Sequence, residues 1–137
     1  MIPGPCSLDT SVVLRLLVSD PLPLFHRATM FLDDQIAAQG AVHVSDHVLA
    51  EAYFALQSFY KIPKVESLEM LASFTRHSGV TVTPVARAVL ALPNLSTIKP
   101  GFVDRLIHGA SRASGHSLVT FEKAAKKLPG TIILPIS

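Results

Sequence analysis

Cysteine and charge are both scarce in this sequence. Cys6 is the only cysteine among 137 residues, which excludes an internal disulfide and a zinc site built on several cysteines. Charged residues make up 16% of the chain and apolar residues 49%. This balance excludes wholesale disorder and allows a real core, so we expect residues 1–137 to form a single domain.

Long apolar runs are missing as well. The longest stretches without a charged side chain, 35–45 and 88–98, have 11 residues each, whereas a membrane-spanning helix needs about 20. The start of the chain also lacks the pattern of a secretory signal peptide, because no basic residue precedes Asp9 and Arg15 interrupts the first apolar stretch. We therefore expect a cytoplasmic protein.

Basic residues gather toward the end of the chain. Residues 1–98 carry six Lys or Arg and eight Asp or Glu, whereas residues 99–137 carry six and two. The basic residues of this end are Lys99, Arg105, Arg112, Lys123, Lys126 and Lys127. A polyanion could bind there, and the alternative is an ordinary solvated helix face.

Strand and helix patterns alternate along the chain. Strands are predicted at 6–8, 41–44, 80–82, 117–120 and 131–134, and helices at 11–18, 24–36, 46–60, 64–76, 84–92, 102–113 and 122–128. Residues 1–5 make a poor strand, because proline donates no ladder hydrogen bond. The alternation predicts a parallel sheet covered on both faces, with a site beyond the carboxyl ends of its strands.

Four acidic residues lie where such a site would form. Asp9 directly follows the first predicted strand, and Glu51 lies two turns into the helix after the second. Asp104 begins the helix before the fourth strand, and Glu122 follows that strand. Taken singly, Asp9 is also a good N-cap, and Asp104 and Glu122 also complement helix dipoles.

Glu51 is the hardest of the four to explain structurally. It sits at the flank of an apolar helix face, where we expect a partly buried carboxylate that needs a cation. An oxygen-only cluster of acids selects Mg²⁺ or Mn²⁺, which can activate water against a phosphoryl group. A zinc site formed by His47 and Glu51 with His43 nearby is the weaker alternative.

Four segments in order resemble the PIN-domain nucleases, particularly the VapC-type toxins of bacterial toxin–antitoxin pairs. They are residues 8–12 (LDTSV), 48–51 (VLAE), 101–107 (GFVDRLI) and 117–123 (SLVTFEK). The resemblance covers almost the whole chain. It departs from the family at Glu122, where Asp is usual, and in the proline-rich start.

The resemblance implies a three-layer α/β/α fold with a central, mostly parallel sheet of four to five strands. It also implies an endoribonuclease that depends on Mg²⁺ or Mn²⁺. Asp9, Glu51 and Asp104 would be the metal ligands and Glu122 the fourth acid, while Ser11 and Thr120 would support these carboxylates. The family's toxins are commonly homodimers that a small antitoxin protein neutralises.

Two further expectations concern RNA and protein partners. We expect Arg105, Lys123, Lys126 and Lys127 to contact the RNA backbone. We also expect part of the apolar surface of the first two helices to meet a second subunit or an antitoxin. The apolar residues concerned are Val12, Val13, Leu14, Leu16, Leu17, Leu22, Leu24 and Phe25.

Two alternatives to the nuclease stay open. In the first, the chain is a catalytically degenerate module of the same fold that binds RNA or a protein partner without cleavage, and Glu122 favours this interpretation. In the second, the chain is an unrelated α/β interaction domain whose acids serve only as helix caps.

Overall fold

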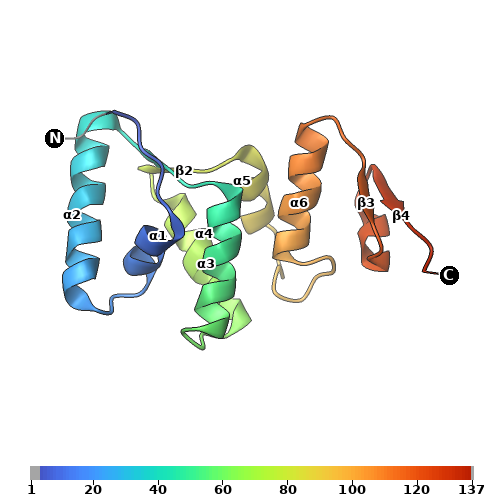
Figure 1. Cartoon of the computed structure of the whole chain (residues 1–137), viewed down its shortest axis with the longest axis horizontal. Coiled ribbons are helices and arrows are strands. Elements are labelled where there is room, and N and C mark those ends of the chain that lie inside the picture. Colours follow the sequence, from blue (N-terminus) through green and yellow to red (C-terminus); the bar gives the residue numbers. More distant parts are fainter. Residues whose placement is uncertain (1–3, 137) are drawn as a thin grey trace. The chain divides into compact units, whose positions relative to one another are not determined.

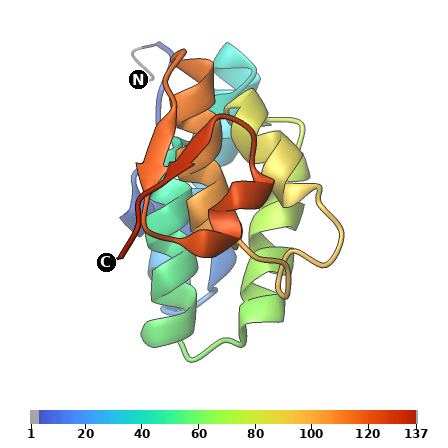
Figure 2. The same cartoon turned by 90° about the vertical axis from the view of Figure 1, so that its right-hand side faces the viewer.

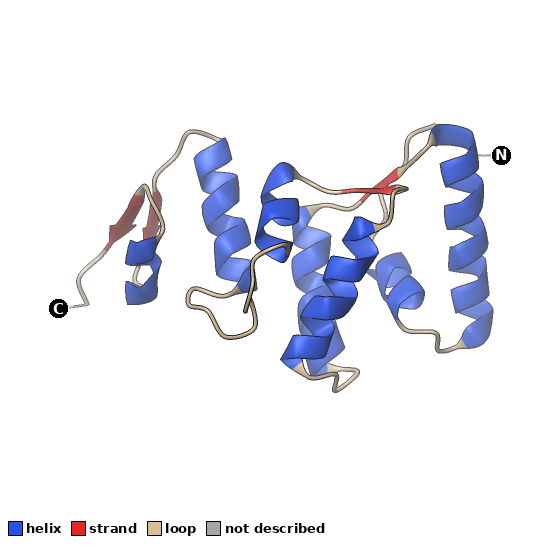
Figure 3. Ribbon diagram, turned by 180° about the vertical axis from the view of Figure 1, so that it is seen from behind, coloured by secondary structure: helices blue, strands red, loops and turns tan. Residues whose placement is uncertain are grey.

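The computed structural model of the chain describes residues 4–136. Its helices are α1 (Thr10–Leu17), α2 (Leu22–Gln39), α3 (Asp46–Ser58), α4 (Lys64–Arg76), α5 (Pro84–Leu90), α6 (Phe102–Ala113) and the 3₁₀ helix η1 (Lys123–Lys127). Its strands are β1 (Val42–His43), β2 (Val80–Thr81), β3 (Leu118–Thr120) and β4 (Thr131–Ile133). Figure 1 shows the order of these elements, and Figure 3 shows which segments are helices and which are strands.

The predicted helices are confirmed, two of them with the same ends. The helices predicted at 64–76 and 102–113 are α4 and α6. Ser45 caps α3 as expected, since its hydroxyl accepts a hydrogen bond from the Val48 N–H at 3.2 Å. Gly40 ends α2 in the left-handed conformation, with a φ of 85°. The last predicted helix, 122–128, is instead a short 3₁₀ helix.

The chain divides into two compact units. The first unit runs to Thr83 and the second begins at Pro84. The first therefore contains α1 to α4 with β1 and β2, and the second contains α5, α6, β3, η1 and β4.

A small parallel sheet organises the first unit. Strand β1 pairs with β2 on one side, with Val42 opposite Val80. On its other side His43 forms an isolated parallel bridge with Ser7. The strand predicted at 6–8 is thus reduced to a single bridge residue within the described chain. The physical reason is the short distance along the chain between Pro5, which cannot donate a ladder hydrogen bond, and the start of α1 at Thr10.

Helices α1, α3 and α4 pack together to form the core of the first unit. The side chains of Val13, Leu49, Leu56 and Leu71 have no solvent exposure. Val13 belongs to the apolar set that was expected to contribute partly to a protein interface, and its burial assigns it to the core. The apolar spacing of these helices is therefore explained by packing within the unit.

The second unit combines a helix pair with another parallel strand pair. Helix α5 packs against α6, and Gly109 of α6 allows this approach, because a Cβ there would overlap Val85 of α5. Strand β3 pairs with β4, with Val119 opposite Ile132, and η1 forms the connection between the two strands (Figure 2).

One face of the β3–β4 pair is apolar and exposed. Val119 and Ile132, which face the same side as register partners, are 54% and 49% exposed. Phe121 and Leu134 follow two positions later on each segment and are exposed as well. A two-stranded sheet has little stability alone, so this face needs a cover.

These elements form an α/β fold with parallel strand pairing, as predicted. The central sheet of four to five strands is not shown, because the described strands form two separate two-stranded sheets. The interpretation of residues 1–5 as a poor strand concerns mostly residues 1–3, which lie outside the described part. Among the described helices, none has the length and apolar character that crossing a membrane requires.

Candidate functional site

Asp9 lies at the end of the Ser7 segment, where the chain turns into α1. Its backbone is extended, and its Oδ1 accepts hydrogen bonds from the Val12 N–H at 3.1 Å and the Ser11 hydroxyl at 2.7 Å. The Ser11 hydroxyl, followed by the Val12 N–H, lowers the pKa of this carboxyl below its ordinary value, although slight burial opposes the shift. Asp9 is therefore both the N-cap of α1 and an ionised carboxylate.

Glu51 lies in α3 and is exposed, with 53% of its side-chain surface open to solvent. The expectation of a partly buried carboxylate at this position is therefore wrong. The neighbouring Ala52 and Tyr53 occupy the core instead, and Glu51 at the flank of that face reaches solvent. Burial therefore does not require a cation at Glu51.

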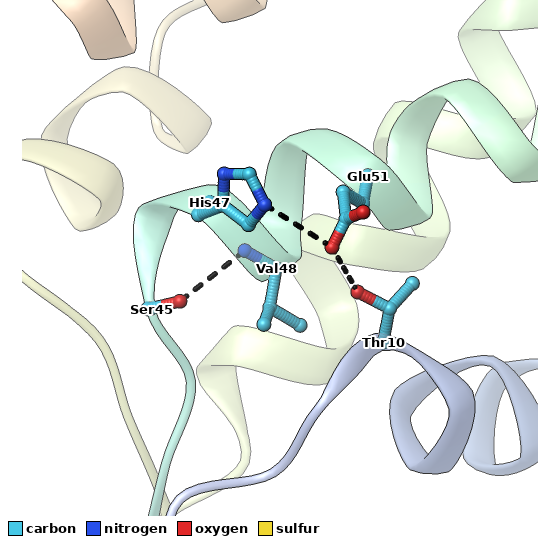
Figure 4. Close-up of polar contacts among 5 residues, drawn as sticks. All are labelled: Thr10, Ser45, His47, Val48 and Glu51. Carbon is cyan, nitrogen blue, oxygen red and sulfur yellow. Dashed lines mark hydrogen bonds and ion pairs between the residues drawn. The ribbon is translucent and has the colours of Figure 1, made fainter.

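The Glu51 carboxylate is nevertheless held in place. Its Oε1 accepts a hydrogen bond from the Thr10 hydroxyl at 2.7 Å, and His47 Nε2 lies 3.4 Å from the same oxygen (Figure 4). The other oxygen, Oε2, has no partner among the described residues. Thr10 follows Asp9 directly in the chain, so this hydrogen bond brings the Asp9 turn next to the middle of α3.

Thr10 is the residue of this site that sequence reasoning missed. Ser11 was predicted as a supporting hydroxyl, and it does donate to Asp9. Thr10 was not predicted as a site residue, yet its hydroxyl contacts a carboxylate 41 positions away. No local pattern indicates a contact between residues so far apart in sequence.

The remaining two predicted ligands lie in the second unit. Asp104 is exposed in the first turn of α6 and has no hydrogen-bond partner in the described part of the chain. Glu122 is the N-cap of η1, and its Oε1 accepts from the Ala124 N–H at 3.2 Å. Thr120 was predicted to support the carboxylates, but its hydroxyl accepts the Glu122 backbone N–H at 3.0 Å instead.

Each unit thus contributes two of the four predicted carboxylates. Within residues 4–136, no three Asp, Glu, His or Cys side chains are grouped closely enough to hold a metal ion. The same finding weighs against the zinc alternative, because His43, His47 and Glu51 are not among such a group within these described residues. The carboxylate oxygens, several of them without a hydrogen bond, are ligands that suit a hard cation such as Mg²⁺ or Mn²⁺.

The predicted RNA-contacting residues differ in how far their side chains are constrained by other residues. Arg105 is half-buried, and its Nε donates to the Pro100 carbonyl at 2.7 Å, which fixes this side chain against the preceding loop. Lys123, Lys126 and Lys127 are exposed on η1 and have no ion pair in the described chain. Three free ammonium groups on one short helix fit either an RNA contact or a solvated face.

Comparison with known protein families gives a match over most of the chain. Residues 7–130 match the family described as PIN domain. The matched range includes Asp9, Glu51, Asp104 and Glu122. None of the curated proteins compared with the chain matches it significantly.

Proposed function

The chain belongs to the PIN-domain family, and on that premise we propose that it is a metal-dependent endoribonuclease that hydrolyses RNA phosphodiester bonds. PIN domains are generally nuclease modules and typically use divalent metals, which supports a hydrolase. The proposal further assigns the chain as the toxin of a toxin–antitoxin pair that acts in the cytoplasm.

The observation that carries this proposal is the paired arrangement of Asp9 and Glu51. Each carboxylate has one oxygen fixed by a hydroxyl from the start of α1, at 2.7 Å in both cases. This arrangement leaves lone pairs on the second oxygen of each group for a cation. Fixed ligands with free lone pairs are what a catalytic metal site requires.

We assign Asp9, Glu51, Asp104 and Glu122 together as the residues that hold Mg²⁺ or Mn²⁺. When bound, such an ion polarises a phosphoryl oxygen and lowers the pKa of a coordinated water. The protein's own contribution is to orient the carboxylates through Ser11 and Thr10 and to keep Asp9 ionised.

The same proposal includes a single domain with one central sheet of four to five strands in a three-layer α/β/α arrangement. The parallel pairing of strands within each unit supports it. Lys123, Lys126, Lys127 and Arg105 are assigned to the RNA backbone, so cleavage should weaken as salt increases.

Protein partners are proposed from the surface of α2. Leu22 is 56% exposed and Met30 66% exposed, so this helix presents large apolar side chains to solvent. We assign this surface to a second subunit or to a small antitoxin protein. Light scattering of the purified chain would test the homodimer, and a strictly monomeric protein at high concentration would contradict it.

A catalytically degenerate module that binds RNA or a partner without cleavage is the second candidate. The observation that favours it is Glu122, which is longer than the Asp usual in the family and whose Oε1 is engaged with the Ala124 N–H. Misplacement of a catalytic group by about 1 Å can cost 100-fold in rate.

The deciding experiment is cleavage of total RNA by the purified protein in Mg²⁺, in Mn²⁺ and in EDTA. An Asp9→Asn variant should lose cleavage, whereas Asp33→Asn, a matched change at an exposed residue of α2, should not. Discrete cuts that need both metal and Asp9 support the nuclease. If antitoxin-free protein makes no cuts in either metal, the degenerate module is favoured instead.

A further inference from the structure

A groove of about 680 Å³ lies between α1 and α2 and reaches the Asp9 turn. Its lining includes Asp9, Arg15, Leu24, Arg27, Ala28 and Phe31. All of these residues belong to the first unit. The volume is within the range of sites that bind small ligands or parts of larger ones.

The groove carries more positive than negative charge. Arg27 is exposed and has no hydrogen-bond or ion-pair partner among the described residues. Arg15 is half-buried and oriented by its neighbours, because its Nη1 donates to the Tyr60 hydroxyl at 3.1 Å. Asp9 is the only acid in the lining. An unpaired arginine and a fixed arginine beside one carboxylate favour an anionic occupant.

The floor of the groove is apolar and contains an aromatic ring. Leu24 is 39% exposed, and Phe31 is half-buried, so both present apolar surface to the groove. An anion alone would gain nothing from such a floor. A nucleotide has both a negative charge and a flat ring, since its phosphate binds arginine and its base stacks on an aromatic side chain.

We propose that this groove binds a single-stranded segment of the RNA substrate, with Arg27 on a phosphate and Phe31 against a base. The inference rests on the proposed function and deepens it, because the groove is continuous with Asp9. An RNA chain with one phosphodiester at Asp9 would extend along α1 and α2 into this groove. A site that needs an unpaired base would direct the activity toward single-stranded RNA rather than duplex.

Binding measured without cleavage tests this proposal separately from the nuclease itself. The probe is a short fluorescein-labelled single-stranded RNA, titrated with protein in EDTA and followed by fluorescence polarisation. Arg27→Gln should weaken binding several-fold and reduce the salt slope by about 0.7. Phe31→Leu keeps an apolar side chain but removes the ring, and it should weaken binding about 5-fold or more.

The matched control is Arg76→Gln, which removes the same charge from an exposed position of α4 outside the groove. It should leave RNA affinity close to that of the unchanged protein. Thermal unfolding of all three variants checks that each is folded. Because Arg27 is exposed and unpaired, its replacement should not alter the unfolding temperature.

Three results would overturn the proposal. Equal losses in Arg27→Gln and Arg76→Gln would show only general charge attraction. Unchanged affinity in Phe31→Leu would remove the base contact. Intact RNA binding in Arg27→Gln, together with weaker binding of a synthetic glutamate-bearing amphipathic peptide, would assign the groove to a protein partner. Absence of cleavage with Arg27-dependent RNA binding would instead reject the nuclease and keep the groove.

Discussion

The two units of the chain hold their candidate ligands in different ways. In the first, Asp9 and Glu51 each accept a hydrogen bond from a hydroxyl of α1, both at 2.7 Å. In the second, Asp104 has no partner among the described residues, and Glu122 accepts only an N–H of the helix that it caps. A carboxylate's position at the end of an element therefore does not by itself organise a site. Neighbouring hydroxyls do so by limiting where the carboxylate can point.

The largest expected effect is common to both units. Glu51→Gln and Asp104→Asn should each lower metal-dependent cleavage by more than about 100-fold, because each removes a charged ligand rather than a supporting group. Isothermal titration with Mn²⁺ should show weaker binding in both. Neither change should lower the unfolding temperature much, since Gln can still accept the Thr10 hydroxyl and the Asp104 carboxylate has no hydrogen bond within residues 4–136. Full turnover in either variant would remove that residue from the site.

Substitutions at Thr10 and Thr120 test most directly whether a hydroxyl must orient a ligand carboxylate. Thr10→Val keeps the size of the side chain but removes the hydroxyl that orients Glu51, so Mn²⁺ affinity and turnover should fall about 10- to 100-fold. Thr10→Ser should restore both. Thr120→Val should have a smaller effect, because that hydroxyl contacts the Glu122 backbone and not its carboxylate. Equal losses at both threonines would contradict the comparison.

A smaller effect is expected at the fourth acid. Glu122→Asp introduces the residue usual in the family and keeps a good helix cap, so turnover should rise several-fold. Single-turnover cleavage at saturating Mg²⁺ or Mn²⁺ measures this change. A fall in turnover would show that the second unit is matched to the longer side chain.

The smallest effect concerns the acid stability of the first unit. The folded-state pKa of Asp9 lies below its unfolded value, so the stability it contributes is present above the unfolded pKa and disappears as pH falls through the folded pKa. Asp9→Asn keeps a capping side chain without titrating, so its unfolding temperature should fall less between about pH 7 and about pH 3. The same pH dependence in both proteins would mean that other groups set the acid limit.

Local signals in the sequence determine most of the secondary structure. Pro63 and Pro84 lie at the starts of α4 and α5, and Ser45 and Gly40 lie at the predicted ends of their helices. These signals act within one turn, so a reading of the sequence finds them. The strand expected at 6–8 was over-extended, because Pro5 donates no ladder hydrogen bond and α1 already begins at Thr10, which leaves room for the single bridge residue Ser7.

Local sequence signals do not predict some features of the site. The exposure of Glu51 depends on which residues of α3 pack into the core. The apolar spacing places Glu51 at the edge of the buried face and does not decide whether its side chain is buried. The hydrogen bond from Thr10 to Glu51 depends on how α1 packs against α3. The combination of Arg27 and Phe31 in a groove with Asp9 likewise exists only because α2 lies beside α1.

The order of the elements and the capping of their ends follow from the sequence alone, because both depend on interactions between residues a few positions apart. The tertiary structure decided which hydroxyl orients which carboxylate, that Glu51 faces solvent, and that a basic and apolar groove extends from Asp9. Those outcomes depend on contacts between distant segments, and a hydrophobic pattern specifies the face that a helix buries without specifying the partner that it meets.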